Sequence, residues 1–405
     1  MVVISTGTGP LCGFRILDLT NVVAGPIATL YLGMLGAEII KIENPRNGGD
    51  VNRSASQTGD ICNARFCTVN HNKRSIALDI SRKEGREVFL KLVEKSDAVV
   101  ENFRSGVMDH LGLGFEQLKC SNPHIVYGNI SGFGSTGRLK DKAAYDVIAQ
   151  AMSGVTMLSG EENDPPVKIG TSIGDVIAGI NLALGVAAAL RAAEKTGTPQ
   201  RVEVALVDAL VSALMMDNVD ALNRNIVPPR VGNGYREWSP YGIYAAKDGF
   251  FALGTGTENH YRKLVTDVLN HPELLNDPRC SSQTVRSKNR EVTEKHLTAW
   301  AMELSVNEVC QKLEEAGIPN AKVDNLLETD NNPHFVEERK LFPILQRPGN
   351  SAVKVTDIPI RFPGTYQAKL TPAPGFGEHC EEILSEFTDL RSEQIHELRR
   401  TGVII

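Results

Sequence analysis

Short stretches rich in Val and Ile alternate with helical patterns through the first third of the chain. The stretches that predict strands are FRILDLT (14–20), EIIKIE (38–43), RSIALDI (74–80), DAVVENF (97–103) and HIVYGNISGFG (124–134). Helical patterns lie between them at 25–36 and 83–96. Strands that alternate with helices in this way predict an α/β fold with a parallel sheet of Rossmann type.

Ligands of such sheets bind beyond the carboxyl ends of the strands. The segments that follow predicted strands are Thr20 to Pro26, Glu43 to Arg46, Asn102 to Arg104 and Ser131 to Gly134. We therefore expect a ligand site built from these segments.

The chain has 405 residues, which is too long for one ordinary core and predicts two or three domains. Residues 1–223 are expected to form the large domain, with one more strand and the start of a helix at 201–210. The Pro-, Gly- and Arg-rich segment 224–240 predicts a linker, and 241–325 a smaller domain that starts with a hairpin at 247–249. Residues 326–405 form a tail that ends in a helix.

Composition and charge disfavour several classes of partner. The net charge is −6 and the isoelectric point about 5.9, so no global basic field favours nucleic acid or an anionic membrane. The longest apolar run, around 176–192, is short for a membrane span and predicts a buried helix. Seven cysteines without zinc spacing indicate reduced thiols. We expect a cytoplasmic protein, or a mitochondrial-matrix one if a presequence has been removed.

Familiar catalytic motifs are absent from the sequence. VVAGP follows the first strand where a dinucleotide fold would carry GxGxxG, and there is no P-loop and no GxSxG. HEL at 396–398 lacks a second histidine at the required spacing, so we expect no metal site.

Asp175 stands at the mouth of an unusually apolar helix, in GTSIGDVIAGINLALGVAAALRAAEKTG (170–197). The simplest interpretation is that its carboxylate caps this helix. Tyr145 and Asp146 precede another helix, and Asp146 has the same simple interpretation. Each of these features alone is a weak indication of function.

Together, several stretches resemble the class III coenzyme A transferases (CaiB/BaiF), which include the formyl-CoA, carnitine and bile-acid CoA transferases. The stretches that carry the resemblance are LDLTNVVAGPIATLYLGMLGAEIIKIENP, NHNKRSIALDI, DAVVENFRSGVMDHLGLG, YGNISGFGSTG, AYDVIAQAMSG, GTSIGDVIAGI, EKTGTPQRVEVALVDAL and AGIPNAKV. The resemblance runs from about residue 11 to the end of the chain.

The resemblance implies an interlocked homodimer in which a Rossmann-like large domain and a smaller α+β domain are joined by linkers. The C-terminal tail returns to the large domain. The family nucleophile corresponds to Asp175, whose carboxylate attacks an acyl-CoA thioester to give an acyl anhydride and then an enzyme–CoA thioester. CoA thioesters are substrates, and no permanently bound cofactor is implied. A mobile glycine-rich loop over the carboxylate corresponds to Gly254, Thr255 and Gly256.

The family's CoA-binding positions carry over unevenly. Positions of suitable type are Val22, Leu78, Asn102, Phe103 and Arg104, together with the Tyr145–Asp146 pair near the thioester. Asn44 stands where Arg is frequent, and Arg46 is the nearby replacement for a phosphate contact. His110 also replaces a frequent Arg. Val23 falls where formyl-CoA enzymes have Gln, which favours an acyl group other than oxalyl.

Two alternatives stay open from the sequence. The same fold carries α-methylacyl-CoA racemases, but their histidine base corresponds to Tyr145, a poor general base at neutral pH. A non-catalytic CoA-binding protein is the other alternative. The transferase interpretation leaves the donor and acceptor acids open, with succinyl-CoA or a similar dicarboxylyl thioester as a candidate donor.

Overall fold

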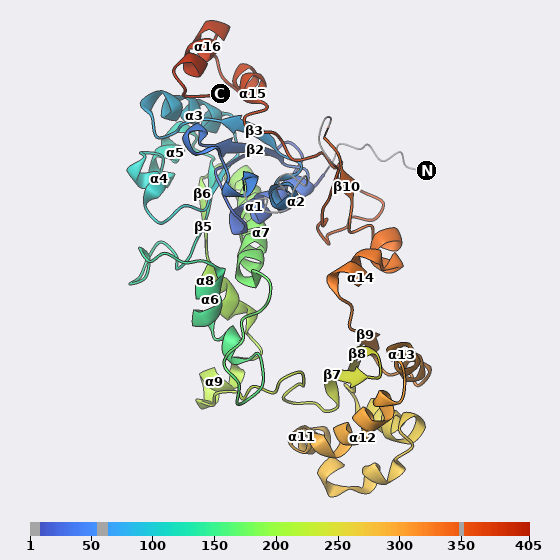
Figure 1. The fold of residues 1–405 in the computed structure, drawn as a ribbon. Coiled ribbons are helices and arrows are strands. Elements are labelled where there is room, and N and C mark those ends of the chain that lie inside the picture. The colour runs from blue at the N-terminus through green and yellow to red at the C-terminus, as the bar shows by residue number, and fades with distance from the viewer. Residues whose placement is uncertain (1–8, 55–63, 348–351) are drawn as a thin grey trace. The chain divides into compact units, whose positions relative to one another are not determined.

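The computed structural model describes residues 9–54, 64–347 and 352–405. A six-stranded parallel sheet forms the centre of one of its two compact units (Figure 1). The strand order is β3-β2-β1-β4-β5-β6. The strands are β1 (Arg15–Asp18), β2 (Glu38–Glu43), β3 (Arg74–Ala77), β4 (Ala98–Glu101), β5 (Val126–Ser131) and β6 (Gln200–Ala205). This is the Rossmann strand order, and its direction reverses between β1 and β4. The predicted α/β class with a parallel sheet is confirmed.

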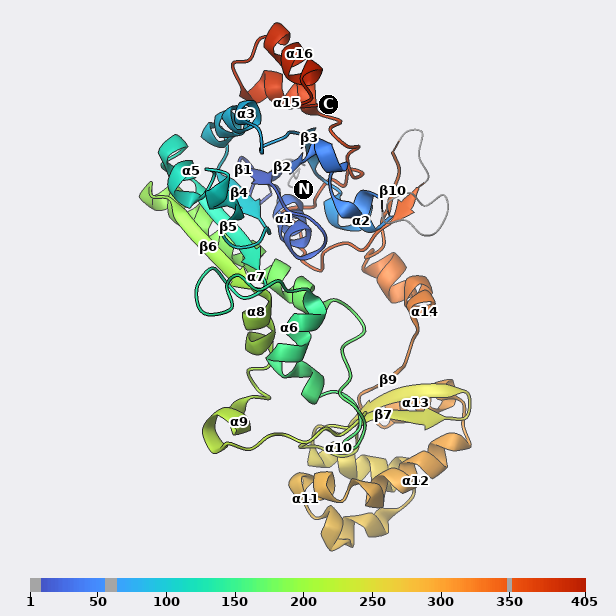
Figure 2. The ribbon, with the colours of Figure 1, turned by 60° about the vertical axis from the view of Figure 1, so that its left-hand side comes forward.

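Helices cover both faces of the sheet, as Figure 2 shows. The helices of the sheet-bearing unit are α1 (Ala24–Met34), α2 (Ala64–Asn70), α3 (Lys83–Glu94), α4 (Val107–His110), α5 (Phe115–Ser121), α6 (Asp146–Ser153), α7 (Ile173–Thr196), α8 (Leu206–Ala213), α15 (Cys380–Phe387) and α16 (Ser392–Arg400). One core joins a face of the sheet to α3, α5 and α15, and a second joins the opposite face to α1, α7 and α8. The sheet is therefore buried on both sides, as its near-continuous apolar strands require.

α7 is apolar enough and long enough to cross a membrane by length and composition alone. In this fold one side of it packs against α1 and the sheet, with Leu182, Val186 and Leu190 buried. The predicted buried helix is thus buried on one side, whereas Leu184 on its other side is 69% exposed and Ile180 is also exposed.

The chain divides into two compact units. The first takes the described residues within Met1–Ser153, Ile169–Met215 and His334–Ile405, and the second takes Gly154–Lys168 and Met216–Pro333. The sequence-based limits at 224, 241 and 326 all fall inside the second unit. Residues 154–168 belong there because Gly232 N–H donates to the Gly160 carbonyl and Arg230 donates to the Glu162 carbonyl.

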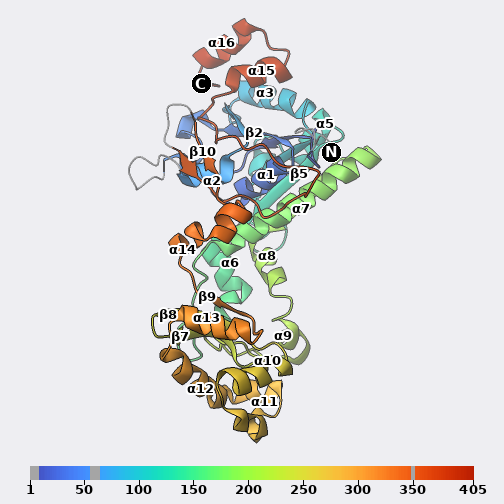
Figure 3. The same cartoon turned by 90° about the vertical axis from the view of Figure 1, so that its right-hand side faces the viewer.

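The C-terminal tail packs on the edge strand β3, near α3 (Figure 3). Ile404 pairs with Leu78, and His379 N–H donates to the Ser75 carbonyl. A two-stranded ribbon, β10 (Ile344–Leu345) with β11 (Val353–Lys354), lies in the same tail.

The second unit is built on a three-stranded antiparallel sheet in the order β7-β8-β9. Its elements are β7 (Tyr241–Ala246), β8 (Gly249–Gly254), β9 (Asn320–Lys322), α9 (Val219–Arg224), α10 (Glu258–Lys263), α11 (Gln283–Lys288), α12 (Arg290–Met302), α13 (Val306–Glu315) and α14 (Leu326–Asn331). A tight turn at Lys247 and Asp248 joins β7 to β8, at the predicted place. The sheet packs on α12 and α13 around Phe251 and Leu297.

Buried charges lie beneath the carboxyl end of β1. Lys73 Nζ contacts Asp18 Oδ2 at 2.9 Å and also donates to Asn70 Oδ1 and Thr29 Oγ1. Both side chains of the pair are fully buried. Burial alone would raise the pKa of Asp18, but the ammonium groups of Lys73 and Lys41 outweigh it and lower that pKa to about 2. Burial lowers the pKa of Lys73 to about 8, so both groups of the pair are charged at neutral pH.

We predict that Lys73→Met lowers the free energy of unfolding by about 3–5 kcal/mol, because it leaves the Asp18 carboxylate buried without its cation. Urea denaturation followed by circular dichroism measures the loss. Lys95→Met, at an exposed position in the same unit, is the control and is expected to change stability by less than about 0.5 kcal/mol. Equal stability of the Lys73 variant and the wild type would contradict the account.

Candidate active site

A cavity of about 220 Å³ opens at the carboxyl end of the sheet. Its lining includes the predicted site residues Val22, Val23, Asn102, Phe103, Arg104, Tyr145 and Asp175. These residues come from the segments after β1 and β4, from the start of α6 and from the first turn of α7. β1 and β4 are the strands at which the sheet order reverses, where α/β folds bind their ligands.

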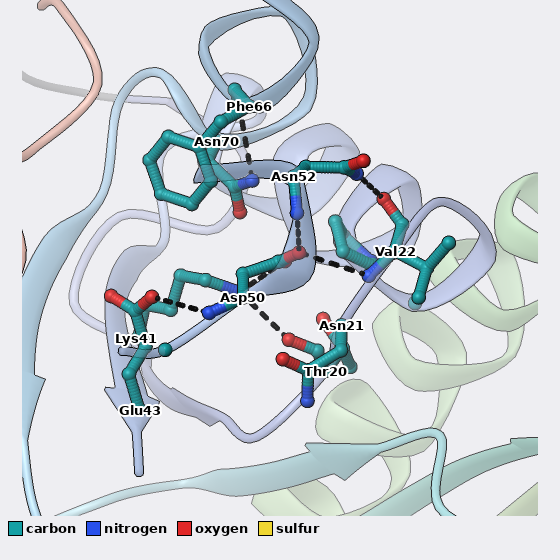
Figure 4. A network of polar contacts seen from close by, with 12 residues as sticks. Thr20, Asn21, Val22, Lys41, Glu43, Asp50, Asn52, Phe66 and Asn70 are labelled. Atoms are coloured by element: carbon teal, nitrogen blue, oxygen red, sulfur yellow. Dashed lines mark hydrogen bonds and ion pairs between the residues drawn. The ribbon is translucent and has the colours of Figure 1, made fainter. Parts of the chain in front are cut away.

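The loop after β1 is held in a strained conformation. Val22 has φ 71°, a left-handed value that is an outlier for a β-branched residue and costs about 1–3 kcal/mol. Figure 4 shows the side chains that hold it. Asp50 Oδ1 accepts from Val22 N–H at 3.4 Å, and Asn52 Nδ2 donates to the Val22 carbonyl at 2.5 Å. Lys41 pairs with Asp50 at 3.3 Å and donates to the Thr20 carbonyl.

Asn102 joins the loops after β1 and β4. Its Oδ1 accepts from Asn21 N–H and its Nδ2 donates to the Asn21 carbonyl, each at 2.8 Å. Both ends of the amide are thus bonded to the backbone across the point where the sheet order reverses. The side chain lines the cavity, but its amide is bonded to the protein, and a direct CoA contact stays a prediction.

Asp175 does not cap its helix. α7 begins at Ile173, after Ser172, which places Asp175 inside the first turn. Among the described residues, no hydrogen bond or ion pair reaches the Asp175 carboxylate. The capping interpretation is therefore wrong, because among the described residues the carboxylate accepts no hydrogen bond from the N–H groups of the helix start.

Asp146, rather than Asp175, accepts a hydrogen bond from the start of α7. Its Oδ1 accepts from Gly174 N–H at 2.8 Å, so an acid on α6 bonds the residue immediately before Asp175. Its Oδ2 accepts from the Gln150 side-chain amide at 2.7 Å. Asp146 thus accepts the hydrogen bond from the helix start that would otherwise stabilise the Asp175 carboxylate. A side chain at 174 would also collide with this arrangement, since an added Cβ would lie 2.9 Å from Asp146 Oδ1.

The environment shifts the titration of Asp175. Burial, and then the negative charge of Asp146, raise the pKa of Asp175 to about 6. The carboxylate is therefore ionised at neutral pH while poorly solvated. Cationic groups line the same cavity, namely Arg104, Lys140 and Lys142, whereas no histidine does among the described residues. A histidine base of the racemase kind is therefore missing from the cavity lining.

His110 does not line the cavity that contains Asp175. It lines a separate cavity of about 570 Å³ with Ser81, Lys83, Arg86 and Glu87. Lys83 and Arg86 supply positive charge beside His110, on the first turns of α3. Lys83 and Arg86 were not selected from the sequence, and a role of His110 in CoA binding stays a prediction.

The remaining predicted CoA positions have structural partners. Arg46 Nε pairs with Asp79 at 2.7 Å, and its side chain remains exposed. Asn44 caps the 3₁₀ turn Pro45–Asn47 by accepting from Arg46 N–H. The Leu78 side chain is 1% exposed and packs in the core beside the C-terminal tail, and a contact between Leu78 and CoA stays a prediction.

Gly254, Thr255 and Gly256 belong to the second unit, at the end of β8. Thr255 is anchored there, with both its N–H and its hydroxyl bonded to the Pro240 carbonyl. The ring of Trp238 packs against Gly256, where an added Cβ would lie 3.3 Å from it. A position of this loop over Asp175 stays a prediction.

Several residues of the site were missed by the sequence reading. Asp50, Asn52 and Gln150 act on the backbone of other site segments, and Lys83 and Arg86 supply charge. The GGD segment that contains Asp50 is a visible signal, because it follows a strand end. No spacing rule connects Gln150 to residues 169–171. Among the described residues, no cluster of three or more His, Cys, Asp or Glu is arranged to hold a metal ion.

Comparison with known proteins gives a consistent result. The pattern of CoA-transferase family III matches residues 11–380. A succinyl-CoA:mesaconate CoA-transferase of Haloarcula hispanica is 33% identical over 389 residues, which cover 93% of this chain and 96% of that protein. An acetyl-CoA:oxalate CoA-transferase of Acetobacter aceti is 35% identical over 94% of this chain and 96% of its own length.

Solved structures support the same family assignment. The crystal structure of a CaiB/BaiF family protein from Brucella suis superposes with a TM-score of 0.83 and 31% identity, covering 94% of this chain and 99% of that one. With its Rossmann-ordered sheet and a match that spans most of its length, the chain belongs to CoA-transferase family III.

Proposed function

We propose that this chain transfers coenzyme A from an acyl-CoA donor to a carboxylic acid, with Asp175 as the nucleophile. The observation that carries the proposal is a half-buried carboxylate, without a hydrogen-bond partner among the described residues, on the wall of the cavity where the sheet order reverses. The names of the relatives support the same reaction class.

In each overall step of the proposed reaction, one bond to an acyl carbon forms and another breaks. Asp175 attacks the thioester carbonyl of the donor, which forms a mixed anhydride and releases the CoA thiolate. The thiolate attacks the Asp175 carbonyl of the anhydride, which gives an aspartyl–CoA thioester and the free donor acid. The acceptor carboxylate then attacks this thioester, and the thiolate attacks the acceptor carbonyl of the second anhydride. New acyl-CoA leaves, and the Asp175 carboxylate is restored with one oxygen from the acceptor.

The two cavities suit different parts of the substrate. We assign the thioester to the cavity with Asp175, and the phosphate groups of CoA to the cavity with Lys83, Arg86 and His110. Contacts far from the reacting bond can offset the high energy of the anhydride. Arg104, Lys140 and Lys142 beside Asp175 favour an acyl group with a second carboxylate, such as succinyl.

Exposed apolar side chains support a homodimer. Ile180 and Leu184 lie one turn apart on α7, and Val147, Ile148 and Met152 are exposed on α6. Water-exposed apolar groups on a helix of this length are typical of an interface. We propose that a second copy of the chain covers them, in the interlocked dimer that the family resemblance implies.

Asp175→Ala is expected to lower the exchange of labelled succinate into succinyl-CoA at least about 10⁴-fold, because the covalent route is removed. CoA affinity, measured by calorimetry, is expected to stay within about threefold of the wild type, since CoA binding relies on contacts away from the thioester. A variant that exchanges at the wild-type rate would contradict the assignment.

The pH dependence of exchange follows from the raised pKa of Asp175. Only the ionised carboxylate attacks, so kcat/KM is expected to rise with pH through about 6 and to level off above it. Asp146→Asn removes the neighbouring charge and is expected to move this limb to lower pH, while burial keeps it above the ordinary value of 3.8. A limb that moves to higher pH in the Asn variant would contradict the proposed electrostatics.

Ile180→Asp combined with Leu184→Asp is expected to convert the dimer into monomers of 44.1 kDa, because two carboxylates would be buried at the interface. Light scattering after size exclusion measures the mass. Leu326→Asp, at an exposed position in the second unit, is the control that is expected to stay dimeric. A double variant that remains a dimer would place the interface elsewhere.

A further inference from the structure

Gln150 is a buried amide one helical turn after Asp146. It lies on α6 and is 0% exposed. Its Nε2 donates to Asp146 Oδ2 at 2.7 Å and to the Thr171 carbonyl at 3.2 Å, and its Oε1 accepts from Ile169 N–H at 2.9 Å. Both of its N–H donors and its carbonyl oxygen are therefore engaged.

These three bonds converge on the segment that leads into the nucleophile. Two of them hold the backbone at 169 and 171, just ahead of α7. The third holds Asp146, whose other oxygen bonds Gly174 N–H. The approach to Asp175 is thus fixed at three backbone positions by two side chains of one helix.

We propose that Gln150 is a positioning residue for the reaction: it orients the Asp146 carboxylate toward Gly174 and holds residues 169–171, so that Asp175 faces the cavity unbonded. The inference rests on the proposed role of Asp175. It adds a residue that touches neither CoA nor acid in this arrangement, since Gln150 is not part of the cavity lining.

The physical reason lies in the Asp146 carboxylate. With Gln150 in place, each of its oxygens has a donor, and the group cannot turn toward Asp175 without breaking a charged hydrogen bond. Without the amide, Oδ2 loses its partner and the carboxylate is free to rotate. A small displacement of a reacting group can cost about 10²-fold in rate. We therefore expect the loss in kcat rather than in the affinity for CoA.

Two substitutions separate positioning from packing. Gln150→Met keeps the length of the side chain and removes all three hydrogen bonds. Gln150→Glu keeps an oxygen for Ile169 N–H but places a carboxylate against Asp146, and at low pH a shared proton can replace the lost N–H donor. Gln200→Leu is the matched control, because the side chain of Gln200 bonds only to Thr198 at the surface.

The experiment measures exchange of labelled succinate into succinyl-CoA between pH 5.5 and 8, relative to the wild type at each pH. Other charged and titratable groups near the site, including Arg104, Lys140, Lys142, Tyr145, Asp175 and the exposed Asp208 on α8, are common to all the enzymes. The carboxylate introduced by Gln150→Glu can raise the pKa of Asp175, which would lower the activity ratio at pH 5.5 and is therefore opposite in sign to the predicted regain. CoA affinity and thermal stability are measured in parallel.

The proposal predicts that Gln150→Met lowers kcat about 30- to 100-fold, with KM for succinyl-CoA within about threefold. Gln150→Glu is expected to show a similar loss at pH 8 and to regain about fivefold or more of relative activity at pH 5.5. The Gln200 control is expected to match the wild type. A kcat within about threefold of the wild type for Gln150→Met overturns the proposal.

A purely structural role gives a different pattern. Both Gln150 variants would then lose CoA affinity and thermal stability together, with the same activity ratio at every pH, and this too overturns the proposal. Asp175→Ala is run alongside. If Asp175→Ala retains exchange, Asp175 is not the nucleophile, and the inference about Gln150 is then wrong as well. If it is inactive while Gln150→Met is fully active, only the role of Gln150 is wrong.

Discussion

Two buried ion pairs below the carboxyl end of β1, Lys73 with Asp18 and Lys41 with Asp50, support the loop on which the candidate site is built. Charges this far from water persist only when their partners are well placed. Here the partners come from β1, β2, the residue just before β3 and the turn after β2, so closing the pairs also brings those elements together. The strained backbone at Val22 is held by the same group, through Asp50.

In the candidate site, Asp146 and Asp175 lie close to the same helix start but have different roles. A carboxylate at a helix start is normally drawn into capping, which stabilises it and weakens it as a nucleophile. Asp146 takes the capping role from another helix, and Asp175 remains unbonded in the first turn of α7. The charge of Asp146 also adds to the effect of burial in raising the pKa of Asp175. Asp146 thereby both bonds the helix start and contributes to the raised pKa of Asp175.

The sequence predicted the parts of this picture that depend on local pattern. Short stretches rich in Val and Ile located the strands, and the positions of Val22, Asn102, Tyr145 and Asp175 beyond strand ends or at a helix start led to one cavity. Prediction from the sequence failed for residues whose role depends on a partner far away in the chain. The simple capping interpretation of Asp175 failed because no sequence rule shows that Asp146, on another helix, accepts from Gly174 N–H. The burial of Leu78 beside the C-terminal tail was not predicted either, because it depends on a segment far away in the chain. Gln150 was missed for the same reason.

The central claim is that the Asp175 carboxylate itself carries the acyl group and CoA. The most direct test incubates the enzyme with succinyl-CoA and succinate labelled with ¹⁸O in its carboxylates, followed by mass spectrometry of the peptide that contains Asp175. The account predicts that this peptide gains labelled oxygen, about 2 Da after one turnover and up to about 4 Da after many, because each turnover returns an acceptor oxygen to Asp175. Labelled product with an unlabelled Asp175 peptide would contradict it.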